Sequence, residues 1–238
     1  MNESFIRTAM LLGIEAEALF SGKSVVICGL GGVGGHCAEA LARCGIGKLH
    51  LIDHDVVQPS NLNRQIVAAK STINMPKVEV MKRRIEDISN CEVSIYRTFI
   101  SKDNVSEILP ITADYIVDAI DTVTSKTSII HEAMVRNLPV VSCMGTGNRL
   151  DPTMIRVGDI FDTEGCPLAR AMRKEMRRKG VKSLKVVYSM EQPLVPTLPD
   201  GERSRNPGSI SFVPAAAGLT LASVVAMDIY NSWALTRA

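Results

Sequence analysis

The stretch KSVVICGLGGVG, residues 23–34, decides the fold of this chain. Its first half is a short β-branched run, which predicts a buried strand over Lys23–Gly29. Its second half has glycines in the spacing G-x-G-x-x-G, and apolar residues at helical spacing follow over Gly32–Cys44. A strand, a glycine loop and a helix in this order direct backbone N–H groups and the positive helix end at a phosphate. The stretch therefore predicts the first unit of a nucleotide-binding sheet.

Alternation of strand and helix patterns continues as far as about residue 145. The patterns predict strands at Lys48–Asp53, Cys91–Thr98, Asp114–Ala119 and Leu138–Met144, and helices at Met75–Ser89 and Thr122–Asn137. Such alternation is typical of a doubly wound parallel sheet. Before the first strand, the segment MNESFIRTAMLLGIEAEALF has the pattern of one amphipathic helix.

The last third of the chain has a different pattern. Strands are expected at Thr153–Ile160, Ser183–Ser189 and Ser209–Val213, a helix at Pro167–Lys179, a long loop at Gln192–Pro207 and a final helix opened by Pro214. The fold class predicted is α/β: a Rossmann-like, doubly wound, mainly parallel sheet extended by a smaller, partly antiparallel C-terminal lobe. We expect residues 1–145 to bind the nucleotide and residues 146–238 to form the substrate side of the same sheet.

Composition excludes several classes of protein. Of the 238 residues, 46% are apolar and 22% charged, which is incompatible with a disordered chain. The net charge of +2 excludes a uniformly basic nucleic-acid binder, and 4% aromatic residues make base-stacking platforms unexpected. The most apolar stretch, Phe212–Met227, is too short to span a bilayer and suits a packed helix. With no signal peptide pattern, we expect a soluble cytoplasmic protein that binds no membrane.

The six cysteines, Cys28, Cys37, Cys44, Cys91, Cys143 and Cys166, form no Cys-x-x-Cys pair. A tetra-thiolate zinc site therefore has no support, and free thiols are expected. Cys166 lies where a loop meets a predicted helix. A thioester or persulfide role is open for it, although an ordinary packed or surface thiol is favoured.

Residues after the second strand favour ATP over a dinucleotide. Asp53 ends that strand, where a carboxylate can accept hydrogen bonds from ribose hydroxyls. Arg64 and Lys77 would place two cations beside a phosphate chain, and Asp121 follows a strand at a position where a carboxylate can hold Mg²⁺. Taken singly, the cations could be solvated surface charges, Asp121 a helix N-cap and the glycines a packed turn. Their combination favours an ATP site.

The motifs GLGGVG, DHDVVQPSNLNRQ, PKVEVM and DAIDT resemble those of the ThiF and ubiquitin-activating-type adenylyltransferases. The resemblance implies ATP-dependent adenylation of a carboxylate, with Mg²⁺. It implies catalytic roles for Arg64, Lys77, Asp121 and Arg7, with Arg7 reaching the ATP of the partner subunit in a homodimer. Asp121 is the implied metal residue. The implied nucleotide-binding residues are Gly29, Gly31, Gly32, Gly34, Asp53, Asp55, Ser60, Asn61, Arg64, Gln65, Lys77, Asp121 and Thr122.

The later segments CPLARAMRKEMRRKG, KVVYSMEQP and GSISFVPAAAGL are similar to the branch that dehydrates threonylcarbamoyladenosine in tRNA. This similarity implies adenylation of the threonyl carboxylate, cyclisation and release of AMP. Residues Arg170–Lys185 contain eight Lys and Arg against one acid, Glu175, and we expect this basic stripe to contact tRNA unless it is merely a solvated helix face.

Three other functions stay open at this point. An adenylyltransferase acting on the C-terminus of a small sulfur-carrier protein would be favoured by an essential Cys166, and a sulfur-transfer partner of the cysteine-desulfurase type is compatible with either enzyme. An NAD-dependent oxidoreductase leaves Asn61, Arg64 and Lys77 without a purpose. A scaffold that keeps the nucleotide fold would tolerate loss of Arg64 or Asp121.

Overall fold

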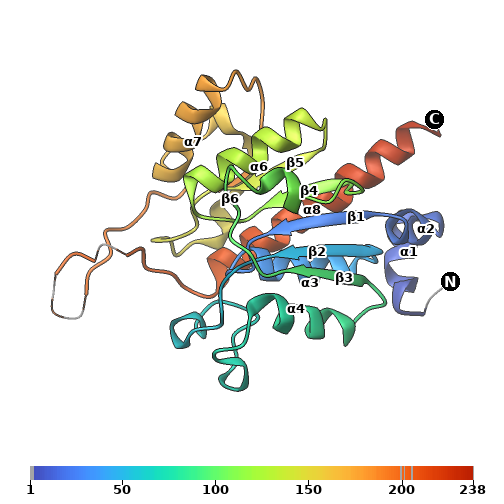
Figure 1. The fold of residues 1–238 in the computed structure, drawn as a ribbon, viewed down its shortest axis with the longest axis horizontal. Coiled ribbons are helices and arrows are strands. Elements are labelled where there is room, and N and C mark those ends of the chain that lie inside the picture. The colour runs from blue at the N-terminus through green and yellow to red at the C-terminus, as the bar shows by residue number, and fades with distance from the viewer. Residues whose placement is uncertain (1–2, 199, 201, 205, 238) are drawn as a thin grey trace.

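Seven strands form one twisted sheet with helices on both faces in the computed structural model, which describes residues 3–198, 200, 202–204 and 206–237 (Figure 1). The strands are β1 (Ser24–Cys28), β2 (Lys48–Ile52), β3 (Glu92–Tyr96), β4 (Tyr115–Asp118), β5 (Val140–Cys143), β6 (Ile155–Asp159) and β7 (Lys185–Ser189). Their order is β3-β2-β1-β4-β5-β7-β6, and β6 is antiparallel to β7 whereas the other neighbours are parallel. The predicted fold class is confirmed.

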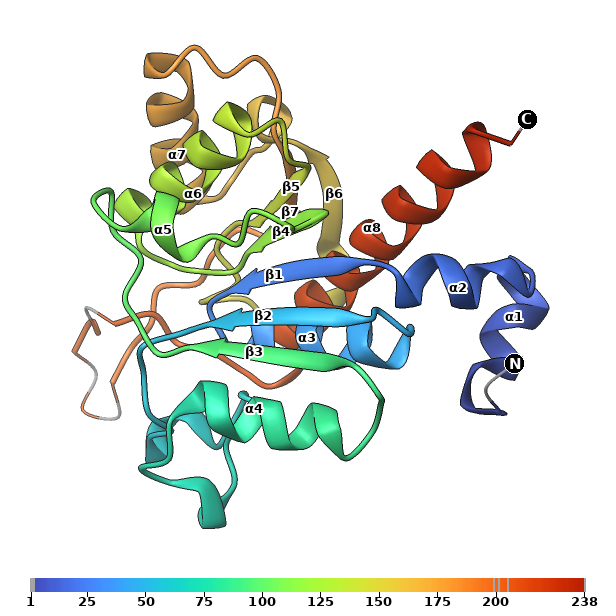
Figure 2. The same cartoon turned by 45° about the vertical axis from the view of Figure 1, so that its right-hand side comes forward.

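The helices connect and cover these strands (Figure 2). They are α1 (Ile6–Leu12), α2 (Glu15–Ser21), α3 (Gly34–Arg43), α4 (Lys77–Glu86), α5 (Val105–Ile108), α6 (Val123–Val135), α7 (Pro167–Arg178) and α8 (Phe212–Leu235). Short 3-10 turns are η1 (Glu3–Phe5), η2 (Pro59–Asn61), η3 (Lys70–Thr72), η4 (Pro152–Met154) and η5 (Ile160–Asp162).

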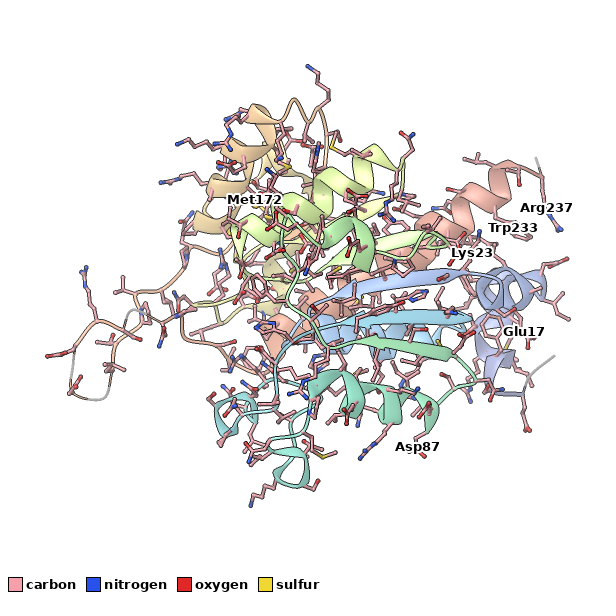
Figure 3. The ribbon with its side chains drawn as sticks, viewed as in Figure 1. Glu17, Lys23, Asp87, Met172, Trp233 and Arg237 are labelled. Atoms are coloured by element: carbon pink, nitrogen blue, oxygen red, sulfur yellow. The ribbon has the colours of Figure 1, made fainter. Side chains whose placement is uncertain are left out.

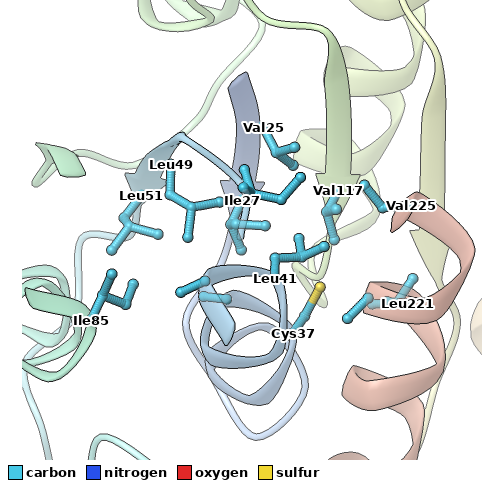
Figure 4. Packing of buried hydrophobic residues seen from close by; sticks show 14 of the residues in the cluster. Val25, Ile27, Cys37, Leu41, Leu49, Leu51, Ile85, Val117, Leu221 and Val225 are labelled. Carbon is cyan, nitrogen blue, oxygen red and sulfur yellow. The ribbon is translucent and has the colours of Figure 1, made fainter. Parts of the chain in front are cut away.

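Alternate residues of the central strands supply two different cores. Val25 and Ile27 of β1 face a cluster shared with α3, α4 and α8, as Figure 4 shows for Cys37, Leu41 and Leu221. Val26 and Cys28 face a second cluster with α5 and α6. Because side chains alternate across a strand, a central parallel strand buried on both faces needs apolar side chains on both, as β1 has from Val25 to Cys28.

A third cluster supports the C-terminal part of the sheet. Met172 and Met176 of α7 pack with Ile130 of α6 and Val186 of β7 (Figure 3 labels Met172). The apolar residues of α7 lie on one side of the helix, which leaves most of its basic residues toward solvent. Half-buried Leu168 packs partly against this cluster.

The predicted strand at Ser209–Val213 is wrong. Helix α8 begins at Phe212 and includes Pro214 in its first turn, so it starts before the proline expected to open it. Proline is tolerated in a first turn because its missing N–H would have no helical partner there. Before the helix, Ser209 O accepts from Asn63 Nδ2 at 3.0 Å, so this stretch meets a side chain and not a neighbouring strand.

The predicted single N-terminal helix is also divided. Gly13 has φ 86° and separates α1 from α2, because this backbone conformation cannot continue a right-handed helix. The structure adds helix α5, which the sequence pattern did not indicate, over only four residues.

The predicted long loop, Gln192–Pro207, contains neither helix nor strand in its described residues, apart from a bridge between Thr197 and Arg203. Residues 199, 201 and 205 of this prediction lie outside the described residues. The backbone N–H of Leu194 donates to Asn148 O at 2.7 Å, and the N–H of Asn148 donates to Gly208 O at 2.8 Å. Both arms of the loop are therefore attached to the segment that follows β5.

Helix α8 is longer than the apolar stretch Phe212–Met227 suggested. Over the described residues, it is the one helix long and apolar enough to cross a membrane. About half of its most apolar window is buried (56%), and it contributes Leu221 and Val225 to the core beside α3. A buried core helix passes the same test of length and composition, so the helix is weak evidence for a membrane span.

Candidate functional site

A cavity of about 730 Å³ lies at the carboxyl ends of the parallel strands. It is lined by the glycine loop after β1 and by the segments that follow β2, β4 and β5. Beyond β1 the chain order changes direction, because β2 lies on one side of it and β4 on the other. Ligands of open α/β sheets bind at such a switch point, because the loops there diverge and leave a crevice.

The glycine loop is built for close approach of a ligand to backbone. Gly29 has φ 90°, and a Cβ on Gly34 would lie 1.8 Å from Gly29 O, so both glycines are needed for the turn itself. Gly31 is different, because a Cβ there would meet only Gln65 Nε2 at 3.9 Å. Gly29, Gly31 and Gly32 line the cavity, whereas Gly34 begins helix α3 outside it.

The carboxylate of Asp53 connects the glycine loop to the segment after β2. Its Oδ2 accepts from Leu30 N at 2.6 Å and its Oδ1 accepts from Asp55 N at 2.8 Å. Asp53 is buried and lines the cavity. The residue that the sequence assigns to ribose thus also holds the loop in place.

Arg64 lies on the cavity wall after turn η2. Its Nη1 donates to Ser60 O and to Asn63 Oδ1, both at 2.9 Å. No ion pair among the described residues includes Arg64, so its charge has no carboxylate partner there. The arrangement leaves a cation available to an anionic ligand.

Lys77 begins helix α4 and reaches the same cavity. Its side chain is 6% exposed, and Nζ lies 2.7 Å from Asp55 Oδ2. Because Asp55 is itself exposed and lines the cavity, the pair presents one buried cation and one accessible anion to a ligand. A polyphosphate would compete with Asp55 for the ammonium group.

Two amide side chains complete this wall. Asn61 Oδ1 accepts from Gln58 N at 3.0 Å and closes the turn. Gln65 is buried, and its Oε1 has no hydrogen-bond partner among the described residues. A buried acceptor without a donor is costly, which favours a ligand that supplies an O–H or N–H.

Two aspartates at the end of β4 and just after it have different surroundings. Asp121 is exposed, lines the cavity with Thr122, and has one weak contact, from Thr122 Oγ1 at 3.4 Å. Asp118 is fully buried, and its Oδ2 contacts Lys126 Nζ at 2.9 Å and Ser142 Oγ at 2.6 Å. Lys126 also donates to Ile120 O and Cys143 O. The buried pair therefore ties together the ends of β4 and β5, while Asp121 is free to meet a cation.

The cavity unites most of the predicted nucleotide residues but not all of them. Gly34, Ser60 and Arg7 are not part of its wall. Arg7 lies on α1, before the amino end of β1, and is therefore remote from the cavity of its own chain (Figure 2).

The sequence interpretation missed Arg149. This residue follows β5, is 3% exposed and lines the cavity beside Gly145. The only signal was an arginine after the glycines of the GTGNR segment, and nothing in the linear pattern distinguishes a buried arginine from a surface one.

The thiols of Cys143 and Cys166 also line the cavity. All six cysteines are free, as expected. Burial raises the pKa of Cys143 to about 12, with smaller opposing contributions from Lys126 and Asp118, so its thiol stays protonated. Cys166 is buried, and its Sγ accepts from Ala169 N at 3.5 Å as the N-cap of α7.

The basic stripe is narrower than predicted. Lys185 belongs to β7, where its Nζ pairs with Asp228 at 2.7 Å, and so it lies apart from α7. Arg173 is half-buried, and its Nη1 donates to Thr163 O at 2.6 Å. The exposed cations on and just after α7 are Arg170, Lys174, Arg177, Arg178, Lys179 and Lys182.

Comparison with known proteins places these features in a family. The model of the ThiF family matches residues 7–227. The tRNA threonylcarbamoyladenosine dehydratase of Bacillus subtilis (strain 168) is 35% identical over 250 residues, which cover 100% of this chain and 98% of that protein. The enzyme of the same name from Escherichia coli (strain K12) is 37% identical over 203 residues, 82% of this chain and 76% of that protein.

A solved structure is also similar over nearly its whole length. The crystal structure of E. coli tRNA N6-threonylcarbamoyladenosine dehydratase, TcdA, in complex with ATP matches with a TM-score of 0.89 and 34% identity. The match covers 98% of this chain and 96% of that one. Sequence, fold and cavity thus agree, and this chain belongs to the ThiF family.

Proposed function

We propose that the chain is an ATP-dependent enzyme that dehydrates threonylcarbamoyladenosine in tRNA. The observation that carries the proposal is one cavity that joins the glycine loop, Arg64 and Lys77 at one end to the segment Gly145–Arg149 at the other. Such a cavity can hold a nucleotide and a second reactant together. The relatives that match the whole chain bear the name of this activity, and one of them is described with ATP bound.

The residues present fit ATP. The open space at Gly31 allows a phosphate to approach the backbone, and the N-terminus of α3 favours negative charge there. Asp53 and the unpartnered Gln65 Oε1 can accept hydrogen bonds from the nucleoside. Arg64 and Lys77 balance the phosphates, and Asp121 would hold Mg²⁺, which neutralises charge on the departing pyrophosphate.

The protein's part in the reaction is alignment and charge stabilisation. The threonyl carboxylate attacks the α-phosphorus of ATP, the bond to pyrophosphate breaks, and an acyl-adenylate forms. The substrate's own carbamoyl group then attacks the acyl carbon, loses a proton and releases AMP, so the tRNA loses one water. Because the attacking group comes from the substrate, the enzyme needs no nucleophile of its own, in keeping with the protonated thiol of Cys143.

The two parts of the chain take different roles in this proposal. Residues 1–145 bind ATP, and residues 146–238 form the substrate side. The exposed cations of α7 bind backbone phosphates of the tRNA. A protein with this substrate is expected in the cytoplasm and is not expected to bind a membrane. A sulfur-transfer partner of the cysteine-desulfurase type belongs to the hypothesis, and co-purification with such an enzyme would test it.

A homodimer is the second part of the proposal. Helix α1 and the turn after it expose Met10, Leu11 and Ile14 by 77%, 85% and 60%. Neighbouring exposed apolar side chains favour a protein contact. Arg7 lies on the same helix and is remote from its own cavity, so a second copy would allow it to reach the partner's ATP.

The proposed activity is tested by incubating the protein with ATP, Mg²⁺ and tRNA that carries threonylcarbamoyladenosine. Mass measurement of the digested nucleosides should show a loss of about 18 Da that requires ATP. Arg64→Ala should lower the rate by about 100-fold or more, because it removes charge stabilisation from the phosphates. Arg97→Ala, at an exposed arginine outside the cavity, is the matched control. ATP binding without any change in nucleoside mass would contradict the proposed substrate.

A second candidate is adenylation of a small sulfur-carrier protein at its C-terminus. The observation in its favour is that Cys166 lines the cavity. Cys166→Ser keeps an oxygen that can cap α7, so stability should change by less than about 1 kcal/mol. We expect this variant to retain dehydration of the tRNA, measured by nucleoside mass. Complete loss of activity in a folded Cys166→Ser protein would favour the carrier-protein reaction.

A further inference from the structure

Arg149 is a buried cation that the adenylation residues do not use. Its Nε donates to Glu191 O at 3.1 Å and its Nη1 donates to Gly147 O at 3.0 Å. Its Nη2 is buried and has no hydrogen-bond partner among the described residues. Two backbone carbonyl groups therefore hold the guanidinium, and its Nη2 group remains available to a ligand.

The charge of Arg149 is also unbalanced. No ion pair within the described part of the chain includes it. The nearby carboxylate of Glu191 accepts instead from the backbone N–H groups of Leu150 and Asp151, at 3.0 and 2.9 Å. Asp151 in turn accepts from Thr153 N. A buried, unpaired cation is unfavourable unless a ligand supplies the anion, so the arrangement points to an anionic group in the cavity.

The position of Arg149 separates it from the phosphate-binding residues. Among the described residues, the cavity is lined by three permanent cations: Arg64, Lys77 and Arg149. The first two belong to segments beyond β2, whereas Arg149 follows β5. Strand β5 is two places from β1, which corresponds to about 10 Å between the glycine loop and the end of β5. Arg149 therefore lies toward the end of the cavity that the second reactant must occupy.

The segment that bears Arg149 is fixed from several sides. Asn148 has φ 61°, and its Oδ1 accepts from Gly208 N at 2.6 Å. Its backbone contacts Leu194 and Gly208, one from each arm of the long loop. Because these contacts set the backbone before Arg149, the guanidinium is held in place before any ligand binds.

We propose that Arg149 binds the threonyl carboxylate of the modified adenosine and holds it for attack on ATP. This inference rests on the proposed function. A planar guanidinium with free N–H donors matches a carboxylate, and the match leaves one carboxylate oxygen for the α-phosphorus. The same guanidinium chemistry would also suit a backbone phosphate of the tRNA, so the experiment must separate these two anions.

The experiment measures the affinity of the protein for three tRNAs in the presence of α,β-methylene ATP, which cannot form the adenylate. One tRNA carries threonylcarbamoyladenosine, the second carries its carboxylate methyl ester, and the third is unmodified. Wild-type protein should bind the first most tightly. Arg149→Gln should weaken that binding by about 30-fold or more and bring the three affinities together. Arg149→Lys, which keeps the charge, should retain part of the preference.

The control variant is Arg156→Gln, at an exposed arginine of β6 outside the cavity, which should behave as wild type. Thermal unfolding and ATP binding without tRNA show whether each variant is folded. If Arg149→Gln does not fold, the three affinities are compared in Arg149→Lys. An equal loss for all three tRNAs would assign Arg149 to a backbone phosphate and overturn the inference. An undiminished preference for the acid in the folded variants would overturn it too. Failure of the wild-type protein to dehydrate tRNA would instead overturn the proposed function.

Discussion

Individual residues of the glycine loop have separable tasks. Gly34 serves the backbone, because any Cβ there would lie 1.8 Å from Gly29 O. Gly31 leaves space for a ligand, because its Cβ position is open apart from Gln65 at 3.9 Å. The sequence motif does not distinguish these glycines, whereas the structure shows which of them the turn itself requires.

A pair of substitutions tests this distinction. Gly31→Ala should leave the free energy of unfolding within about 1 kcal/mol of wild type and weaken ATP binding, because the methyl group takes the space of a phosphate. Gly34→Ala should lower the free energy of unfolding by about 1–3 kcal/mol or more, because backbone must move to relieve the clash. Urea unfolding and ATP titration would check both. Normal ATP affinity in Gly31→Ala would contradict the assignment of the open space.

At the same scale, sequence reasoning anticipated some site residues better than others. Asp53, Arg64, Lys77 and Asp121 belong to recognisable motifs, and the structure brings all four to one cavity. Arg149 could not be foreseen, because its place depends on contacts with groups distant in sequence, such as the carbonyl group of Glu191.

Among the elements, the predicted strands of the parallel sheet were found because short apolar or alternating runs recur between helical patterns. The expected strand before Pro214 was wrong, since a short apolar run carries no information on whether a neighbouring strand exists for it. The break at Gly13 shows a related limit. One glycine was compatible with a continuous amphipathic pattern, yet its positive φ ends the helix.

The exposed cations of helix α7 are predicted to contact tRNA phosphates. Lys174→Ala should weaken binding to any tRNA and reduce the slope of log affinity against log salt by about one unit, because one phosphate contact is lost. Arg83→Ala is the control, because this exposed residue lies on α4 on the far side of the molecule from α7 (Figure 2). Titrations at several salt concentrations would measure the slopes. Equal slopes for wild type and Lys174→Ala would leave the basic face of α7 as a solvated surface.

In the whole molecule, the cavity and the exposed apolar side chains of α1 lie at opposite ends of the sheet. The cavity lies at the carboxyl ends of the strands, and α1, α2 and the end of α8 lie near the opposite end, where Figure 3 labels Glu17, Lys23 and Trp233. If a second copy binds at that end, the exposed apolar side chains of α1 become covered and Arg7 gains a function that a single chain cannot give it.

Association through this surface is tested by Leu11→Asp. A buried charge without a partner opposes association, so the variant should sediment as a monomer and lose most of its ATP-dependent activity. Ile111→Asp, at another highly exposed apolar residue (90%), should leave both unchanged. Sedimentation velocity and the nucleoside mass assay would measure the two properties. A Leu11→Asp protein that sediments as wild type would exclude this interface.

The sequence by itself determined the class of the fold, the strand-loop-helix unit over residues 23–43 and the motif residues that converge on the cavity. These depend on local periodicity and on glycines at fixed spacing, and both are properties of the linear chain. Only the tertiary structure decided that Asp118 pairs with Lys126, that Lys185 leaves the basic face of α7 and that Arg149 is buried without a counter-ion. The physical reason is that burial and pairing of charges depend on groups that the fold brings together from distant positions.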